Sequence, residues 1–297
     1  MELAEFQVWS VSPLPSSKLT RVTHALVLLG ALCDPLSAEV QPPSEFIPKR
    51  VVSIDYCADQ YLLKLGTASQ ILGVSPKSTS PFSYMREKAE NFDQVRPLAE
   101  ELISLKPDLV IRSFGGGVGI SKFLDQHNIP VLQIGFLHSL KEIDETIMAV
   151  ANALGNHVLG IDLINELHHR LTVIPTKKKK TDAMYLAAGG VTAGTGTLVH
   201  NILARGNLKN IVDTPGWSDI PLERLTSLRP GIVVHSYLDD LKTNSGAWSP
   251  ARHPVTKKFL ESNVGVSIPP AIISCGGWYS LDAIEVISRV QEEYKTH

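Results

Sequence analysis

Two stretches, "LAEELISLKPDLVI" at residues 98–111 and "PLERLTSLRPGIVV" at residues 221–234, follow the same pattern. When Glu100 is aligned with Glu223, five further positions coincide in residue type: Leu102 with Leu225, Ser104 with Ser227, Leu105 with Leu228, Pro107 with Pro230, and Val110 with Val233. Each copy has the spacing of a short helix, a proline that ends it, and an apolar run typical of a buried strand. The repeat therefore predicts two lobes built alike.

Strand and helix patterns alternate around both copies. We expect strands at 50–56, 70–75, 108–113 and 130–135 in the first half, and at 183–190, 231–236 and 271–275 in the second. Apolar residues at helical spacing separate them, and glycines such as Gly66 and Gly206 suit helix ends. This alternation predicts an α/β fold in which each lobe has a parallel-type central sheet flanked by helices.

Residues 139–171 have helical periodicity almost throughout. Gly155 and Gly160 interrupt the pattern, so two helices are plausible, the second being a long connector between lobes. We therefore expect an N-terminal lobe at 49–150, a connecting helix at 151–174 and a C-terminal lobe at 181–297.

The first 38 residues have the features of a signal peptide. A short apolar core, "HALVLLGALC", follows Lys18 and Arg21, and Ala38 is a suitable cleavage position. The polar leader before the core is long, so the true start could lie nearer Leu19. Lipidation at Cys33 is the weaker alternative, because Leu32 is larger than the residue that usually precedes a lipidated cysteine.

Composition argues against nucleic-acid binding. The net charge is -2 and charged residues make up 20% of the chain, so there is no broad basic surface. The one basic run, Lys177 to Lys180, is interpreted as a solvated connector.

Cys57 and Cys275 remain once the leader is set aside. In an exported protein they are a candidate disulfide, although two separate buried thiols fit the sequence equally well. Their Cα atoms must lie within about 7 Å for a bridge to form.

The chain from about Arg50 onward resembles the periplasmic substrate-binding proteins of ABC importers whose lobes are joined by a rigid helix. The marks are "RVVSID", "LLKLG", "ILGVS", "EELISLKPDLVI" and the second copy of the repeat. The resemblance implies two Rossmann-like lobes joined by one long helix, a periplasmic location, and a cargo that is cobalamin, a ferric siderophore or haem. It also implies a monomer that catalyses no reaction and has no cofactor, its cargo being a cobalt or iron chelate.

The family places a permease-docking glutamate seven residues before the proline of each repeat. That position is Glu100 before Pro107 and Glu223 before Pro230. The alternative is that both are ordinary acidic residues in the first turn of a helix.

Small ligands bind α/β sheets at the carboxyl ends of the strands, so the cleft should be formed by the loops that follow them. These loops are 55–59, 75–84 and 113–119, and then 190–197, 214–219, 235–240 and 275–280. Aromatic residues are only 6% of the chain, yet they gather in these loops. The predicted ligand-binding residues are Tyr56, Tyr84, Phe114, Gly115, Gly116, Trp217, His235, Tyr237, Trp278 and Tyr279. Core packing of Tyr56 and Tyr279 is the alternative for those two.

Two other functions remain open. A binding protein for a bare metal ion would need clustered histidines, and His235 is the only one at a clear strand end. His235 or Tyr237 could instead contact the metal of a chelate. A chelatase-like enzyme would need a base, a nucleophile or a phosphate loop, and no such motif is present.

Overall fold

The structure is a computed structural model that describes residues 46–294, apart from residue 188 and residues 237–252. The expected signal peptide at 1–38 and Tyr237 lie outside the described residues. None of the described helices has the length and apolar character needed to span a membrane.

The first lobe alternates strands and helices as the sequence predicts. Its elements are β1 (Val51–Ser53), α1 (Tyr56–Leu65), β2 (Ile71–Gly73), α2 (Arg86–Ala89), α3 (Ala99–Leu105), β3 (Leu109–Arg112), α4 (Ile120–Gln126) and β4 (Val131–Gln133). The strands form a parallel sheet in the order β2-β1-β3-β4. The predicted parallel sheet of the first lobe is confirmed.

The second lobe repeats this plan. Its elements are β5 (Thr181–Ala187), β6 (Val191–Ala193), α7 (Leu198–Arg205), β7 (Leu208–Asn210), β8 (Trp217–Asp219), α8 (Leu222–Leu225), β9 (Ile232–Ser236), α9 (Pro254–Glu261), β10 (Val264–Ser267), α10 (Pro270–Ile273) and α11 (Ser280–Tyr294). The main sheet is parallel and, from its other edge, has the order β7-β5-β9-β10. Each strand thus takes the place of its counterpart in the first sheet. The antiparallel pair β6–β8 is an addition within this lobe.

The repeated sequence unit occupies the same position in both lobes. Leu102 of α3 is buried with Val110 of β3, and Leu225 of α8 is buried with Val233 of β9. In each lobe the short helix packs on the strand that follows the repeated proline. The prediction of two lobes built alike is confirmed.

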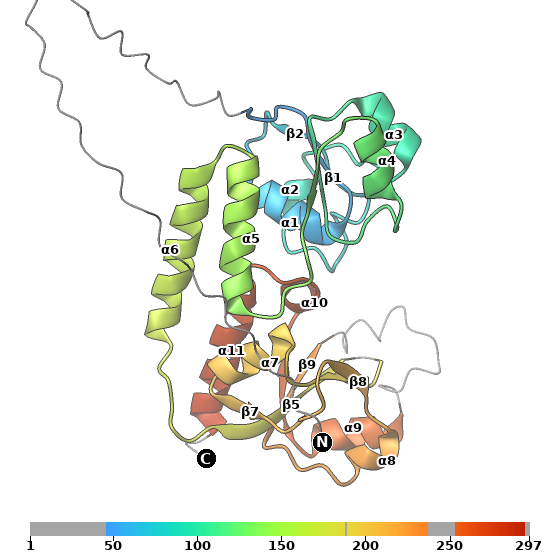
Figure 1. Ribbon diagram of the computed structural model, residues 1–297. Coiled ribbons are helices and arrows are strands. Elements are labelled where there is room, and N and C mark those ends of the chain that lie inside the picture. Colours follow the sequence, from blue (N-terminus) through green and yellow to red (C-terminus); the bar gives the residue numbers. More distant parts are fainter. Residues whose placement is uncertain (1–45, 188, 237–252, 295–297) are drawn as a thin grey trace, which may run out of the picture. The chain divides into compact units, whose positions relative to one another are not determined.

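Two helices follow β4, and the second of them connects the lobes. α5 (Leu140–Ala153) and α6 (His157–Val173) lie side by side (Figure 1), and α6 leads into the second lobe. The connector therefore begins at His157, and residues 151–153 belong to α5. Gly160 lies inside α6, where a side chain would collide with Ala151 of α5, so this glycine allows the helices to approach closely.

Two secondary-structure predictions in the second lobe were wrong. Residues 271–275 were expected to form a strand, but Pro270–Ile273 form α10, because Pro270 is suited to the first position of a helix. Residues 214–219 were expected to be a loop, but Trp217–Asp219 form β8.

Candidate ligand-binding site

A cavity of about 450 Å³ lies between the lobes. The first lobe lines it with Tyr56 after β1, Ser113 and Phe114 after β3, and the segment 134–138 after β4. The second lobe contributes the first turns of α7, Trp217 of β8 and residues 273–276. The first-lobe residues follow the carboxyl ends of parallel strands, as predicted for an open α/β sheet.

Three aromatic side chains of the lining remain open to solvent. The exposed fraction is 42% for Phe114, 77% for Phe136 and 55% for Trp217. Tyr56 meets Phe114 edge to face, with ring centroids 5.4 Å apart. Large exposed aromatic surfaces gathered around one cavity favour an apolar or flat ligand, because covering them releases water at little cost in side-chain entropy.

The cavity wall has few ionisable groups. Among the described residues that line it, none is lysine, arginine, aspartate or glutamate, and His138 is the only histidine. No group of three or more His, Cys, Asp or Glu side chains suited to a bare metal ion occurs in the described part of the chain. Polar atoms in the wall come from backbone and from hydroxyls such as those of Ser113 and Thr197.

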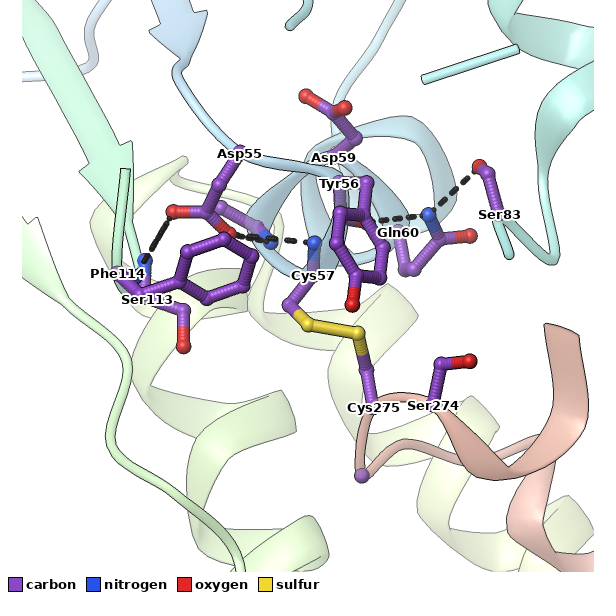
Figure 2. The surroundings of a disulfide bond; sticks show 12 residues. Asp55, Tyr56, Cys57, Asp59, Gln60, Ser83, Ser113, Phe114, Ser274 and Cys275 are labelled. Carbon is purple, nitrogen blue, oxygen red and sulfur yellow. Dashed lines mark hydrogen bonds between the residues drawn. A yellow bond between two sulfur atoms is a disulfide. The ribbon is translucent and has the colours of Figure 1, made fainter. Parts of the chain in front are cut away.

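Asp55 holds the first-lobe wall in place (Figure 2). One carboxylate oxygen accepts hydrogen bonds from the backbone N–H groups of Ser113, Phe114 and Gly115 at 2.6, 3.0 and 2.9 Å. The other accepts from the N–H groups at the start of α1, those of Cys57 at 3.2 Å and Ala58 at 3.0 Å. A single buried carboxylate thus fixes the loop carrying Phe114 against the helix carrying Tyr56.

Gly115 is required by this close approach. A Cβ atom at this position would overlap the backbone carbonyl of Ile54 and also meet Asp55. The glycine lets the loop after β3 come close enough for Asp55 to bind three consecutive N–H groups. Gly115 therefore supports the cavity wall, whereas Gly116 has a φ of 78° and packs against Ile120.

Cys57 and Cys275 form a disulfide that joins the lobes (Figure 2). Their Cα atoms are 5.5 Å apart, within the range that a disulfide spans without backbone movement. Both residues also line the cavity, so the bridge is part of its wall. Of the two arrangements that the sequence left open, the structure contains the disulfide.

Tyr84 and Tyr279 lie in the contact between lobes, not in the cavity lining. Their rings stack with centroids 4.6 Å apart, and the Tyr84 hydroxyl donates a hydrogen bond to Asp282 at 2.8 Å. Burial and the nearby Asp282 carboxylate raise the pKa of Tyr84 to about 12. Tyr279 is 1% exposed, so core packing describes this residue.

Trp278 belongs to the same interlobe contact. It is 6% exposed and meets Tyr61 edge to face, with Lys64 above its ring at 5.9 Å. The Tyr61 hydroxyl donates to the carbonyl of Gly276 at 3.1 Å, which again joins the two lobes.

His235 is part of the main sheet of the second lobe and does not line the cavity. It lies on β9, and its ring is beside Gly265 of the neighbouring β10, away from the described lining of the cavity. Its predicted companion, Tyr237, lies outside the described residues.

Sequence reasoning missed the segment after β4. Residues 134–138 line the cavity and include the exposed Phe136 and His138. The rule that selected the other loops applies here too, since this segment follows the carboxyl end of a parallel strand.

Asp59 is buried on α1 and is absent from the described lining of the cavity. Its carboxylate accepts hydrogen bonds from the hydroxyls of Ser53 and Ser75 and from the Ser75 N–H. Burial away from water nevertheless raises the pKa of Asp59 to about 7, because the hydrogen bonds only partly offset the lost hydration.

Glu100 and Glu223 are exposed in the first turns of α3 and α8. The aligned leucines Leu102 and Leu225 are buried beneath them. Each lobe therefore presents one carboxylate from the same place in its fold. A first-turn carboxylate is also favoured by the helix dipole, so the geometry is compatible with both interpretations.

Comparisons with known proteins agree with this architecture. A family model described as "Periplasmic binding protein" matches residues 51–252, more than half of the chain. None of the curated proteins compared with the chain matches it in sequence.

Solved structures share the fold at low sequence identity. A periplasmic heme-binding protein of Vibrio cholerae is 19% identical over 81% of this chain and 98% of its own, with a TM-score of 0.65. A periplasmic vitamin B12-binding protein of Vibrio cholerae is 16% identical over 84% and 99%, with a TM-score of 0.61. An ABC transporter substrate-binding protein of Listeria monocytogenes is 13% identical over 84% and 100%, with a TM-score of 0.64.

Proposed function

Because the chain belongs to the periplasmic binding protein family, we propose that it captures a metal chelate between its lobes and delivers it to an ABC transporter permease. The cargo would be haem, a corrinoid such as cobalamin, or a ferric siderophore, and the location extracytoplasmic, reached through the N-terminal signal. The chain would act as a monomer and catalyse no reaction.

The observation that carries this proposal is the aromatic lining of the interlobe cavity. Phe114, Phe136 and Trp217 are exposed around about 450 Å³ of space, and the described lining residues include no Asp, Glu, Lys or Arg and a single histidine, His138. A bare metal ion would need several carboxylate, thiolate or imidazole ligands close together, and the described residues contain no such group. A chelate brings its own donor atoms and offers a large surface for the rings to cover.

Titration of tryptophan fluorescence tests this proposal. Cyanocobalamin, hemin and two ferric siderophores would be added in turn to the purified chain. One of them should quench the tryptophan fluorescence saturably. Trp217→Phe should remove most of the quenching. Trp278→Phe is the matched control, because this tryptophan is buried in the contact between the lobes and is absent from the described lining of the cavity. Absence of quenching by every probe, together with a thermal shift caused by Zn²⁺, would contradict the chelate proposal.

Glu100 and Glu223 would dock the two lobes on the permease. Paired charges of this kind set the orientation and rate of association more than its final strength. Alanine at either position should reduce stimulation of the permease's ATPase, and the double variant should nearly abolish it. Glu261→Ala removes an exposed carboxylate elsewhere and should have no effect. Equal stimulation by all variants would show that both are ordinary first-turn residues.

A further inference from the structure

His138 is held at the cavity by its backbone from both lobes. Its N–H donates to Glu142 at 2.7 Å, and its carbonyl accepts from the side-chain amide of Asn201 on α7 at 2.7 Å. The next residue, Ser139, caps α5 by accepting from the Glu142 N–H at 3.2 Å. The position of His138 is thereby fixed between α5 and α7.

The imidazole of His138 is left available by these contacts. The side chain is exposed and lines the cavity, and it makes no hydrogen bond with any described residue. Three other side chains of the wall that could ligate a metal are engaged with the protein itself. Cys57 and Cys275 are joined in the disulfide, and the Tyr61 hydroxyl donates to Gly276.

The neighbours of His138 suit a flat ring. Phe136 lies two residues away with most of its surface exposed, and Trp217 and Phe114 line the same cavity. A macrocycle covered by these rings leaves the axial positions of its metal free to meet a side chain. Neutral imidazole is a good ligand for iron and cobalt.

We propose that His138 is an axial ligand to the metal of the bound chelate, which rests on the proposed function. Its unprotonated ring nitrogen donates a lone pair to the metal, and a metal-bound water leaves. The other ring nitrogen keeps its proton, and the oxidation state of the metal is unchanged. The site would then select planar tetrapyrroles with an exchangeable axial position over siderophores that already fill the coordination sphere of iron.

Diaquocobinamide and hemin are the probes, because each has exchangeable axial positions. With the wild-type chain, the visible spectrum of cobinamide should shift to that of a nitrogen-coordinated corrinoid. The ferrous haem complex should show an iron–histidine stretch by resonance Raman spectroscopy. His138→Ala should lose both signatures and bind cobinamide roughly tenfold or more weakly. Added imidazole should restore the spectrum of this variant.

His169→Ala is the matched control, since His169 is an exposed histidine on α6 outside the cavity lining, and it should behave as wild type. A probe that binds with unchanged axial water, or a tyrosinate spectrum that persists in His138→Ala, would overturn the ligation while leaving the proposed function standing. If neither probe binds the wild-type chain, the ligation is wrong. The proposed function falls with it only if cyanocobalamin and the siderophores also fail to bind.

Discussion

Removing the interlobe disulfide should cost the protein a large part of its stability. The variant is Cys57→Ser with Cys275→Ser, which deletes the bridge between α1 and the segment before α11. The two cysteines are 218 positions apart, so in the oxidised denatured chain they close a very long loop.

The size of the effect follows from that loop. The chain-entropy relation for a loop of 218 residues gives a loss of about 18 cal/mol/K in the denatured state, or about 5 kcal/mol at 25 °C. Residual structure in denatured chains reduces such figures, so we expect a loss of about 3–5 kcal/mol. The 5.5 Å Cα separation requires no backbone movement that would offset the gain.

Urea unfolding followed by far-UV circular dichroism measures the difference. With a slope of about 3 kcal/mol/M, the unfolding midpoint should fall by about 1 M or more. Wild-type protein reduced under native conditions is the control, because it loses the bond without gaining serine hydroxyls. A midpoint within about 0.2 M of wild type in both would refute the entropic reasoning and show that the lobes are held together without the bridge.

Three other substitutions test separate features. Gly115→Ala places a Cβ against the carbonyl of Ile54, so we expect a loss of about 2–3 kcal/mol in thermal unfolding. An unchanged melting temperature would mean that the loop has room to move. Asp59→Asn tests the raised pKa. The folded protein holds this proton up to about pH 7 and the unfolded chain only to about pH 4, so wild-type unfolding free energy should fall by up to about 4 kcal/mol across that window as pH rises. The asparagine variant should show a shallower fall in urea titrations at each pH, and equal slopes would contradict the shift. Tyr84→Phe removes the hydrogen bond to Asp282 and should cost about 1–2 kcal/mol in the same urea assay. A change smaller than about 0.3 kcal/mol would mean that this hydrogen bond contributes no more to stability than a solvent-exposed one.

Local patterns were sufficient to predict the architecture. Leu102 and Leu225 lie at matching places in two short helices, and both are buried in the same way. Proline and the β-branched runs after it set the ends of the helices and the starts of β3 and β9. These signals depend on residues adjacent in sequence, so the elements that they predict are the ones found in the structure.

The two errors in the second lobe have different causes, one a local proline signal and the other a pairing between distant strands. The isoleucines at 272 and 273 favour a strand, yet Pro269 and Pro270 begin a helix there. Trp217 was expected in a loop, and pairing with β6 makes it part of a strand. Strand pairing depends on a partner far along the chain, which residue composition does not specify.

The candidate site could be predicted by location but not by side chain. The expectation that ligands bind at the carboxyl ends of parallel strands correctly placed Tyr56, Phe114 and Trp217 at the cavity. Tyr84 and Trp278 follow the same rule but turn into the contact between lobes. Which way an aromatic ring turns is decided by packing across the interface, and no pattern within one lobe encodes it.

The bridge between Cys57 and Cys275 also makes the polypeptide a covalent ring over most of its described length. A single proteolytic cut anywhere between these residues would leave the two fragments attached to one another. A protein that works outside the cytoplasm among proteases would therefore tolerate a nick in any of its intervening loops without losing half of its binding cleft. Such nicked molecules would run as one band on an oxidising gel and as two on a reducing one.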